Sequence, residues 1–201
     1  MIVKYYIKMV VAAICILLLM VCIHFQLTTG LDRAVYQTLR EHMKSEVVVQ
    51  YLHIISNVFS PVNCLIYILI ILVGLFVYRR FLFWWYGLWC FSIFAIGTFL
   101  KYVIQRTRPN IDIDGFSFPS MHVLSICILV SFILLLKRNK LLKIIAVCLV
   151  VSLMISRIYL QAHYFTDTLA SLFVIYMMLQ ACYLMQNSDK RFQTTEPPDK
   201  N

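Results

Sequence analysis

Long apolar segments alternate with short polar ones along the chain. Continuous apolar runs occur near residues 5–25, 61–78, 83–104, 120–136, 141–160 and 167–186, and each approaches the ~20 residues that a helix needs to cross a bilayer. The apolar residues do not alternate with polar ones, which disfavours the strands of a membrane barrel. We therefore expect an all-α integral membrane protein whose six helices form one bundle over residues 1–186.

The first apolar run could also be a cleaved signal peptide, because Lys4 and Lys8 precede it. It is long for a signal-peptide core, however, and no A-x-A-like cleavage site follows it, so we interpret it as a helix of the bundle.

Two segments differ from this pattern. Residues 26–60 mix charges with apolar residues at Leu31, Val35, Leu39 and Met43, a helical spacing that predicts an amphipathic segment on the outer face, where it could shape a lipid entrance. A packed connecting helix without substrate contact fits the same pattern. Residues 187–201 form a polar, proline-containing tail, which we expect to be cytoplasmic and disordered.

Composition supports the membrane assignment, because 62% of the 201 residues are hydrophobic and only 13% are charged. The formal net charge of +9 would suggest nucleic acid as a partner of a soluble protein. Here, however, many basic residues fall at the N-terminus, in alternate loops or in the tail: Lys4, Lys8, Arg79, Arg80, Lys137, Arg138, Lys140, Lys143, Lys190, Arg191 and Lys200. By the positive-inside rule both termini are cytoplasmic, and the loops near 26–60, 105–119 and 157–166 face outward. The expected partner is therefore the lipid bilayer, and nucleic acid is not expected.

The seven cysteines predict neither a disulfide framework nor a zinc site. They lie in or beside apolar runs and show no C-x-x-C spacing, as small buried hydrophobic residues do. No cluster of carboxylates for a divalent metal is evident either, since Asp112 and Asp114 are best interpreted as loop and turn residues.

Polar residues cluster in three segments of the expected outer side. In "KYVIQRTRP", Lys101 and Arg108 are seven residues apart, close to two helical turns, so both cations would share one face if the helix continues. Pro109 would then end that helix. Arg106 could be a second substrate contact, but we interpret it as a cation facing lipid headgroups.

The second segment, "FSFPSMHV", begins the fourth long apolar helix. Pro119 suits a first helical turn, and Ser117 or Ser120 could cap it. The free N–H groups of that turn form an anion site to which Ser120 adds a hydroxyl, beside His122.

The third segment, "SRIYLQAHYFTD", places Arg157 at the end of the fifth helix and His163 and Asp167 at the start of the sixth. If that turn is helical, the four-residue spacing puts Asp167 where it can accept an imidazole N–H of His163. One nitrogen of His163 would then be free to act as a nucleophile. Such a set of cations, hydroxyl, histidines and carboxylate suits a phosphoryl group.

In their joint order and spacing, K-x6-RP, P-S-x-H and S-R-x5-H-x3-D resemble the type 2 phosphatidic acid phosphatase (PAP2) superfamily, which shares its site with vanadium haloperoxidases. The resemblance implies that His163 attacks phosphorus to form a phosphohistidine, supported by Asp167, while His122 protonates the leaving oxygen and then activates water. It implies no metal and no cofactor. It assigns the phosphate oxygens to Lys101, Arg108, Arg157, Ser120 and the backbone N–H of Met121.

Met121 departs from the resembled motif, which usually has glycine at this position. The peptide N–H survives the change, but the side chain must point away from the anion. It could narrow the entrance or touch an acyl or prenyl chain. A residue packed against its neighbours is the simpler interpretation.

We therefore expect a membrane lipid phosphatase in a bacterial plasma membrane, with its site on the extracytoplasmic face and a lipid phosphate as substrate. A polyprenyl diphosphate such as undecaprenyl diphosphate is the first hypothesis. Phosphatidylglycerophosphate, phosphatidic acid and a lipid A phosphate remain alternatives, as does phosphotransfer to another acceptor. A non-enzymatic anion-binding or transport protein is the alternative of another class. The sequence does not indicate an oligomeric state.

Overall fold

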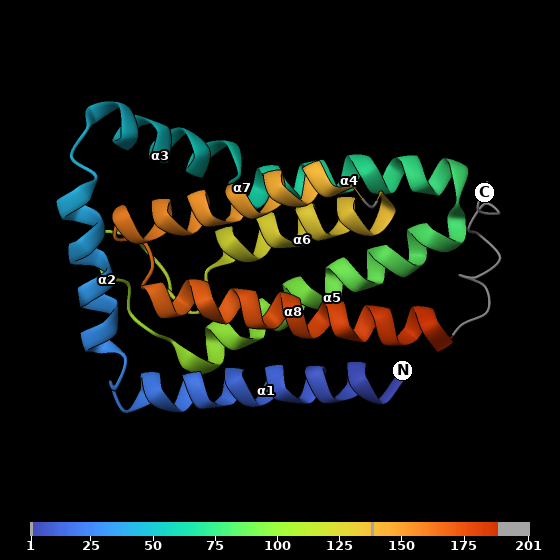
Figure 1. The fold of residues 1–201 in the computed structure, drawn as a ribbon, viewed down its shortest axis with the longest axis horizontal. Helices are drawn as coiled ribbons and strands as arrows, with labels where there is room; N and C mark the ends of the chain where they lie inside the picture. The colour runs from blue at the N-terminus through green and yellow to red at the C-terminus, as the bar shows by residue number, and fades with distance from the viewer. Residues whose placement is uncertain (1, 138, 189–201) are drawn as a thin grey trace.

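The computed structural model describes residues 2–137 and 139–188, which form eight α-helices (Figure 1). Their bounds are α1 (Ile2–His24), α2 (Thr29–His42), α3 (Glu46–Val58), α4 (Pro61–Tyr78), α5 (Arg80–Ile104), α6 (Met121–Leu136), α7 (Lys140–Tyr159) and α8 (Phe165–Ser188). The all-α fold class is confirmed. Most of the predicted polar tail, from residue 189 onward, lies outside the described residues.

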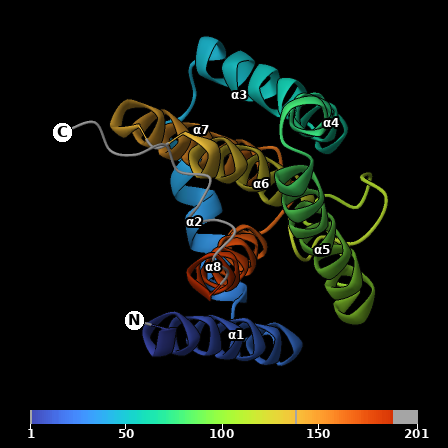
Figure 2. The same cartoon turned by 90° about the vertical axis from the view of Figure 1, so that its right-hand side faces the viewer.

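Five helices, α1, α4, α5, α7 and α8, are long and apolar enough to cross a membrane by length and composition. The sixth apolar segment lies in α6, which has only 16 residues and is shorter than the usual spanning length. Figure 2 looks along the bundle and shows α6 between α4, α5, α7 and α8. Its side chains are buried on every face from Val123 to Leu129, as expected for a helix that is hydrophobic all round.

The segment 26–60 forms two helices, and neither is only a surface layer. Helix α2 crosses one end of the bundle, and α3 continues beside α7 (Figure 1). The residues of α2 that face the protein include Asp32, which is only 3% exposed, whereas Leu31 is 52% exposed. The inward face therefore follows Thr28, Asp32 and Tyr36 more closely than the row of apolar residues that starts at Leu31.

The helix ends are set by local chemistry. Ser60 caps α4, because its Oγ accepts from the N–H of Asn63 at 3.3 Å and Pro61 follows at the first helical position. Asn139 caps α7 through the N–H of Leu141 at 2.8 Å. Helix α5 ends earlier than Pro109 requires, at Ile104, because Gln105 adopts a left-handed conformation with φ of 49°.

The connections between the helices lie at two opposite ends of the bundle. Figure 1 shows the start of α1, the α4–α5 turn and the α6–α7 turn together at one end, and α2 with the 105–120 loop at the other. The first of these ends carries Lys4, Arg79, Arg80 and Lys140, and the second holds the polar residues described next.

Candidate active site

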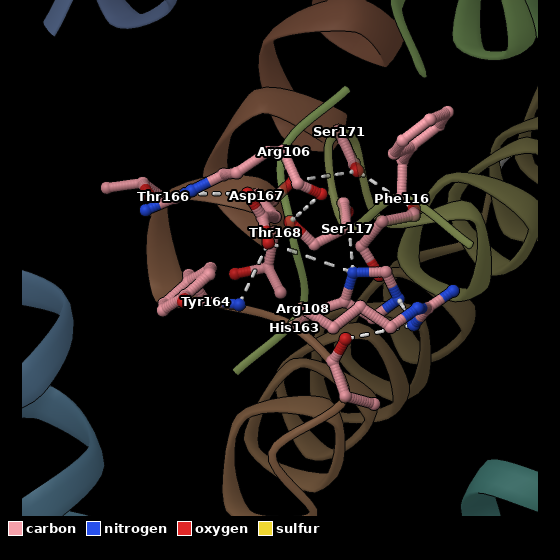
Figure 3. Close-up of polar contacts among 12 residues, drawn as sticks. Arg106, Arg108, Phe116, Ser117, His163, Tyr164, Thr166, Asp167, Thr168 and Ser171 are labelled. Carbon is pink, nitrogen blue, oxygen red and sulfur yellow. Dashed lines mark hydrogen bonds and ion pairs between the residues drawn. The ribbon is translucent and has the colours of Figure 1, made fainter. Parts of the chain in front are cut away.

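The candidate site is built on His163, which lies between α7 and α8 and is 2% exposed. Its Nδ1 is 2.7 Å from the backbone carbonyl oxygen of Ser117, and its Nε2 is 3.4 Å from Nη1 of Arg108 (Figure 3). A carbonyl oxygen only accepts and a guanidinium only donates. Both neighbours therefore require a neutral imidazole with the proton on Nδ1 and the lone pair on Nε2.

Burial supports the same protonation state. The pKa of His163 falls from 6.5 to about 4, chiefly because the ring is buried; Asp167 raises this pKa, and the charges of Arg157 and Arg108 help to lower it. At neutral pH the ring is thus uncharged, and Nε2 is available as a nucleophile.

Asp167 supports His163 differently from the sequence prediction. Its Oδ2 is 3.8 Å from Nδ1, which is ion-pair distance and too long for a hydrogen bond. That oxygen instead accepts the N–H of Tyr164 at 2.9 Å. The reason is local: α8 begins at Phe165, so His163 precedes the helix and does not share its face with Asp167.

Arg108 reaches the site from a loop and not from a helix face. Because α5 ends at Ile104, the seven-residue spacing from Lys101 does not correspond to two helical turns here. The Arg108 guanidinium donates to the carbonyl oxygens of Asp114, Gly115 and Ala162 at 2.9–3.2 Å. Lys101, near the end of α5, donates to the carbonyl oxygen of Phe116 at 2.7 Å.

The start of α6 holds a buried hydroxyl without a protein partner. Ser120 is the N-cap residue and is 0% exposed, yet its Oγ makes no hydrogen bond within the described residues. Ser117 does not cap either, because its Oγ donates to the carbonyls of Arg106 and Thr107. Pro119 precedes the cap and is not in the first helical turn as predicted. The hydroxyl of Ser120 and the free N–H groups after it are thus available to an anion.

Two further predicted residues face the same space. The ring of His122 lies 6.5 Å from that of His163, measured between centroids. Arg157, in the last turn of α7, donates from Nη1 to Oγ of Ser56 at 2.5 Å, and its Nε is buried with no hydrogen-bond partner among residues 2–137 and 139–188.

Met121 points into the helix packing. Its Sδ would lie 3.2 Å from a Cβ added at Gly97 of α5, and its side chain packs against the apolar core. Where the motif usually has glycine, this chain has Met121, and the residue opposite it on α5 is Gly97. The missing side chain of Gly97 leaves room for that of Met121.

The sequence interpretation of Arg106 was wrong. Its guanidinium does not face headgroups; it contacts the carboxylates of Asp32 and Asp167, both at 2.7 Å. Asp32 was missed altogether. The one possible signal was its spacing, because Asp32 lies four residues from both Thr28 and Tyr36, which share its inward face.

The sequence model of the PAP2 superfamily matches residues 82–191. Phosphatidylglycerophosphatase B of Bacillus subtilis (strain 168) is 31% identical over 173 residues, which cover 76% of this chain and 82% of that protein. The chain belongs to the PAP2 superfamily.

Two crystal structures share the fold of this PAP2 protein. The transmembrane PAP2 type phosphatidylglycerolphosphate phosphatase from Bacillus subtilis superposes with a TM-score of 0.75 at 27% identity, over 92% of this chain and 98% of that one. Aquifex aeolicus LpxE has a TM-score of 0.58 at 14% identity, over 78% of this chain and 95% of that one, and is a likeness of fold alone. The PAP2 protein is an integral membrane lipid phosphatase, a hydrolase of phosphoric esters.

Proposed function

We propose that this PAP2 phosphatase hydrolyses the phosphomonoester of phosphatidylglycerophosphate through a phosphohistidine on His163. The observation that carries the reaction is the pair of contacts on the His163 ring: Nδ1 faces the Ser117 carbonyl and Nε2 faces the Arg108 guanidinium, which places the proton on Nδ1 and a lone pair on Nε2. The choice of lipid is supported by the Bacillus subtilis relative, whose name is phosphatidylglycerophosphatase B.

In the first step Nε2 of His163 attacks phosphorus, and the bond between phosphorus and the lipid oxygen breaks. The proton for the leaving alkoxide comes from His122, on the other side of a phosphoryl group held between the two rings. In the second step His122 takes a proton from water, the water oxygen attacks phosphorus, and the P–N bond breaks to release inorganic phosphate.

The negative charge on the phosphoryl oxygens is met by Lys101, Arg108 and Arg157, by the Ser120 hydroxyl and by the N–H of Met121. Arg157 Nε and Ser120 Oγ support this role, because both are buried polar atoms that have no hydrogen-bond partner in the part of the chain that the structure describes. A buried polar atom without a hydrogen bond destabilises a protein unless a bound ligand supplies the missing partner. Their contribution to the rate is electrostatic, and it needs no rearrangement when charge develops on the oxygens.

The cations favour one phosphoryl group over two. Of the two arginines in the 105–120 loop, Arg108 faces His163, whereas Arg106 is engaged by two carboxylates and is not available to a second phosphate. This favours a phosphomonoester over undecaprenyl diphosphate, the first hypothesis from sequence.

We also propose that the site faces the extracytoplasmic side, with both termini in the cytoplasm. The support is the distribution of basic residues: the α4–α5 and α6–α7 turns lie at the bundle end opposite the site (Figure 1). Accessibility of a single cysteine to a membrane-impermeant maleimide, placed at Asp112 or at Lys140 in a background without exposed cysteines, tests this. Labelling of intact cells at Lys140 and not at Asp112 would contradict the proposed orientation.

The test of function is phosphate release by purified protein in detergent from a panel of lipids, with EDTA present. The panel contains phosphatidylglycerophosphate, phosphatidic acid, undecaprenyl diphosphate and a lipid A phosphate. We expect the highest kcat/KM with phosphatidylglycerophosphate, and an acid-labile, base-stable phosphoenzyme that is missing in His163→Ala. Preference for undecaprenyl diphosphate would overturn the substrate, and phosphate release by His163→Ala would overturn the nucleophile. A phosphorylated acceptor in place of free phosphate would indicate phosphotransfer.

A further inference from the structure

Arg106 lies between two buried carboxylates from opposite ends of the chain. Its Nη1 donates to Oδ1 of Asp167 at 2.7 Å, and its Nη2 donates to Oδ2 of Asp32 at 2.7 Å. The side chain of Arg106 is 12% exposed, and those of Asp32 and Asp167 are 1% and 0% exposed. One guanidinium thus connects α2 with the helix that follows the nucleophile.

Further contacts fix the guanidinium plane and the position of Asp32. The Cζ of Arg106 lies 3.9 Å from the centre of the Tyr164 ring, a stacking arrangement that suits a planar cation. Asp32 accepts both the N–H and the hydroxyl of Thr166, each at 2.9 Å. Residues 164 to 167, directly after His163, are therefore held from two sides (Figure 3 shows Arg106, Tyr164, Thr166 and Asp167 together).

The arrangement leaves Asp167 fully engaged without a direct hydrogen bond to His163. Oδ1 accepts from Arg106 and Oδ2 accepts from the Tyr164 N–H, while His163 Nδ1 is 3.8 Å away. The position of the carboxylate relative to the imidazole is thus set by Arg106 and by the backbone. A bidentate or bridging guanidinium fixes such a position more closely than an ammonium can.

Asp32 has an electrostatic effect as well as a geometric one. Arg106 paired with Asp167 alone would cancel the charge that should stabilise the imidazole when positive charge develops on it. With Asp32 present, the group of three carries one net negative charge. That charge remains beside His163.

We infer that Arg106 and Asp32 are positioning residues of the reaction, which hold Asp167 at the nucleophile and preserve its charge there through contacts between α2, the 105–120 loop and α8. The inference rests on the proposed function, because Asp167 can support the reaction in this way only if His163 is the nucleophile. Neither residue touches the substrate. Both act through Asp167.

The experiment compares Arg106→Gln, Asp32→Asn and the double variant with the unmodified protein in detergent. Steady-state kcat and KM are measured with phosphatidylglycerophosphate, and rapid acid-free quenching gives the amplitude and the rate of phosphoenzyme formation in a single turnover. The amplitude counts active sites. The rate per site reports the chemistry, so a purely structural role would lower the amplitude and leave the rate unchanged.

We expect Arg106→Gln to lower kcat and the single-turnover rate per site about 10- to 100-fold, the usual cost of losing a residue that orients a reacting group. KM should change less than about 3-fold, because the cations that bind phosphate remain. Asp32→Asn should shift the rate in the same direction, and the double variant should be no slower than Arg106→Gln, since both residues act through one carboxylate.

Two matched controls lie on α2 itself. Glu41→Gln and Arg33→Gln make the corresponding changes at exposed side chains, and both should keep the rate per site of the unmodified protein. If Arg106→Gln does not purify as a single species, the rate per site of Asp32→Asn and of Arg106→Lys tests the inference instead. Arg106→Lys keeps the charge but cannot reach both carboxylates, and we expect a loss of about 3- to 10-fold.

A rate per site equal to that of the unmodified protein in the folded Arg106 and Asp32 variants would overturn the inference alone. The absence of phosphoenzyme and of phosphate release from the unmodified protein and both controls would overturn the proposed function, and the inference with it. A KM increase with unchanged kcat in Arg106→Gln would also overturn the inference, because it would make Arg106 a substrate contact.

Discussion

The Nδ1 atom of His163 donates to the carbonyl oxygen of Ser117 at 2.7 Å, so a backbone group and not a carboxylate fixes the tautomer of the proposed nucleophile. A backbone carbonyl does not titrate and cannot be removed by substitution of a side chain. In this respect the site differs from a triad in which the carboxylate itself holds the imidazole proton.

This difference predicts an unequal cost of two substitutions. Asp167→Asn should lower kcat by about 10- to 100-fold, because the charge that supports the imidazole is lost while Ser117 still fixes the tautomer. His163→Ala should show no phosphoenzyme. Quench-flow measurement of phosphoenzyme formation checks both, with Asp114→Asn as a control at an exposed carboxylate. Equal inactivity of Asp167→Asn and His163→Ala would contradict the role given to Ser117.

The pH dependence follows from the neutral imidazole. Burial lowers the pKa of His163 to about 4, and only the unprotonated ring can attack phosphorus. We therefore expect kcat/KM to decrease as the pH falls through about 4. No loss due to His163 is expected near its ordinary pKa of 6.5. The free energy of unfolding should decrease over the same range, because His163 of the unfolded chain binds a proton at a higher pH than the folded one. The contribution of His163 to this free energy is full above pH 6.5 and is lost as the pH falls toward 4.

Asp167→Asn provides the comparison for this profile. The carboxylate raises the pKa of His163, so its neutralisation should move the acidic limb of kcat/KM to lower pH. A limb that moves to higher pH in Asp167→Asn would show that His163 is not the group that titrates.

Ser120 should matter for activity but not for stability. Its buried Oγ has no hydrogen-bond partner in the described protein, so Ser120→Ala removes a desolvated polar atom without breaking a bond. We expect an unchanged or slightly higher Tm in detergent and a decrease in kcat/KM of about 10-fold, measured by thermal unfolding and phosphate release. A clear loss of Tm would indicate that the hydroxyl serves as a helix cap after all.

Ser56 should affect substrate binding through Arg157. The Ser56 hydroxyl accepts from Nη1 of Arg157 and holds the end of α7 against α3. Ser56→Ala should raise KM by about 3- to 10-fold, because the guanidinium loses the contact that orients it toward phosphate. Ser60→Ala, on the same side of the molecule but at the α4 cap, should leave KM unchanged. An unchanged KM in Ser56→Ala would show that Arg157 is oriented without it.

Met121 and Gly97 should behave as a packed pair. An added Cβ at Gly97 would lie 2.5 Å from Leu124 Cδ2 and 3.2 Å from Met121 Sδ, so Gly97→Ala should destabilise the protein by about 1–3 kcal/mol. Met121→Gly should lower Tm by loss of packing but keep kcat within about 3-fold, because the peptide N–H is retained. A large loss of kcat in Met121→Gly would assign the side chain a part in the reaction.

The sequence was sufficient for the fold class and for the residue types that meet at the site, but helical spacing misled at Arg108 and Asp167, because α5 ends at Ile104 and α8 begins at Phe165. It predicted the all-α fold, and the residues expected around the phosphate lie together, with His163, His122, Arg108 and Ser120 near the start of α6. It was insufficient where a partner is a backbone group or lies far along the chain. The Ser117 carbonyl has no side-chain signature, and the left-handed Gln105, which ends α5 early, lacks the glycine that usually announces such an end.

Arg106 shows the second limit. On sequence alone a cation in an outer loop is equally consistent with a headgroup contact, because its partners Asp32 and Asp167 are 74 and 61 residues away. Amphipathicity also misled, since it emphasised the apolar row of α2 and concealed the one acid that faces inward.

The Asp32–Thr166 hydrogen bonds join residues 134 positions apart, and this separation has a consequence for biogenesis. During synthesis α1 and α2 are made long before α8. Until α8 follows, Arg106 can pair with Asp32 but not with Asp167, and Asp32 lacks its contacts with Thr166. A chain that stops before α8 therefore has Lys101, Arg108 and Arg157 but lacks the carboxylate proposed to support His163. Addition of the final helix completes the contacts of Asp32 and the proposed site together.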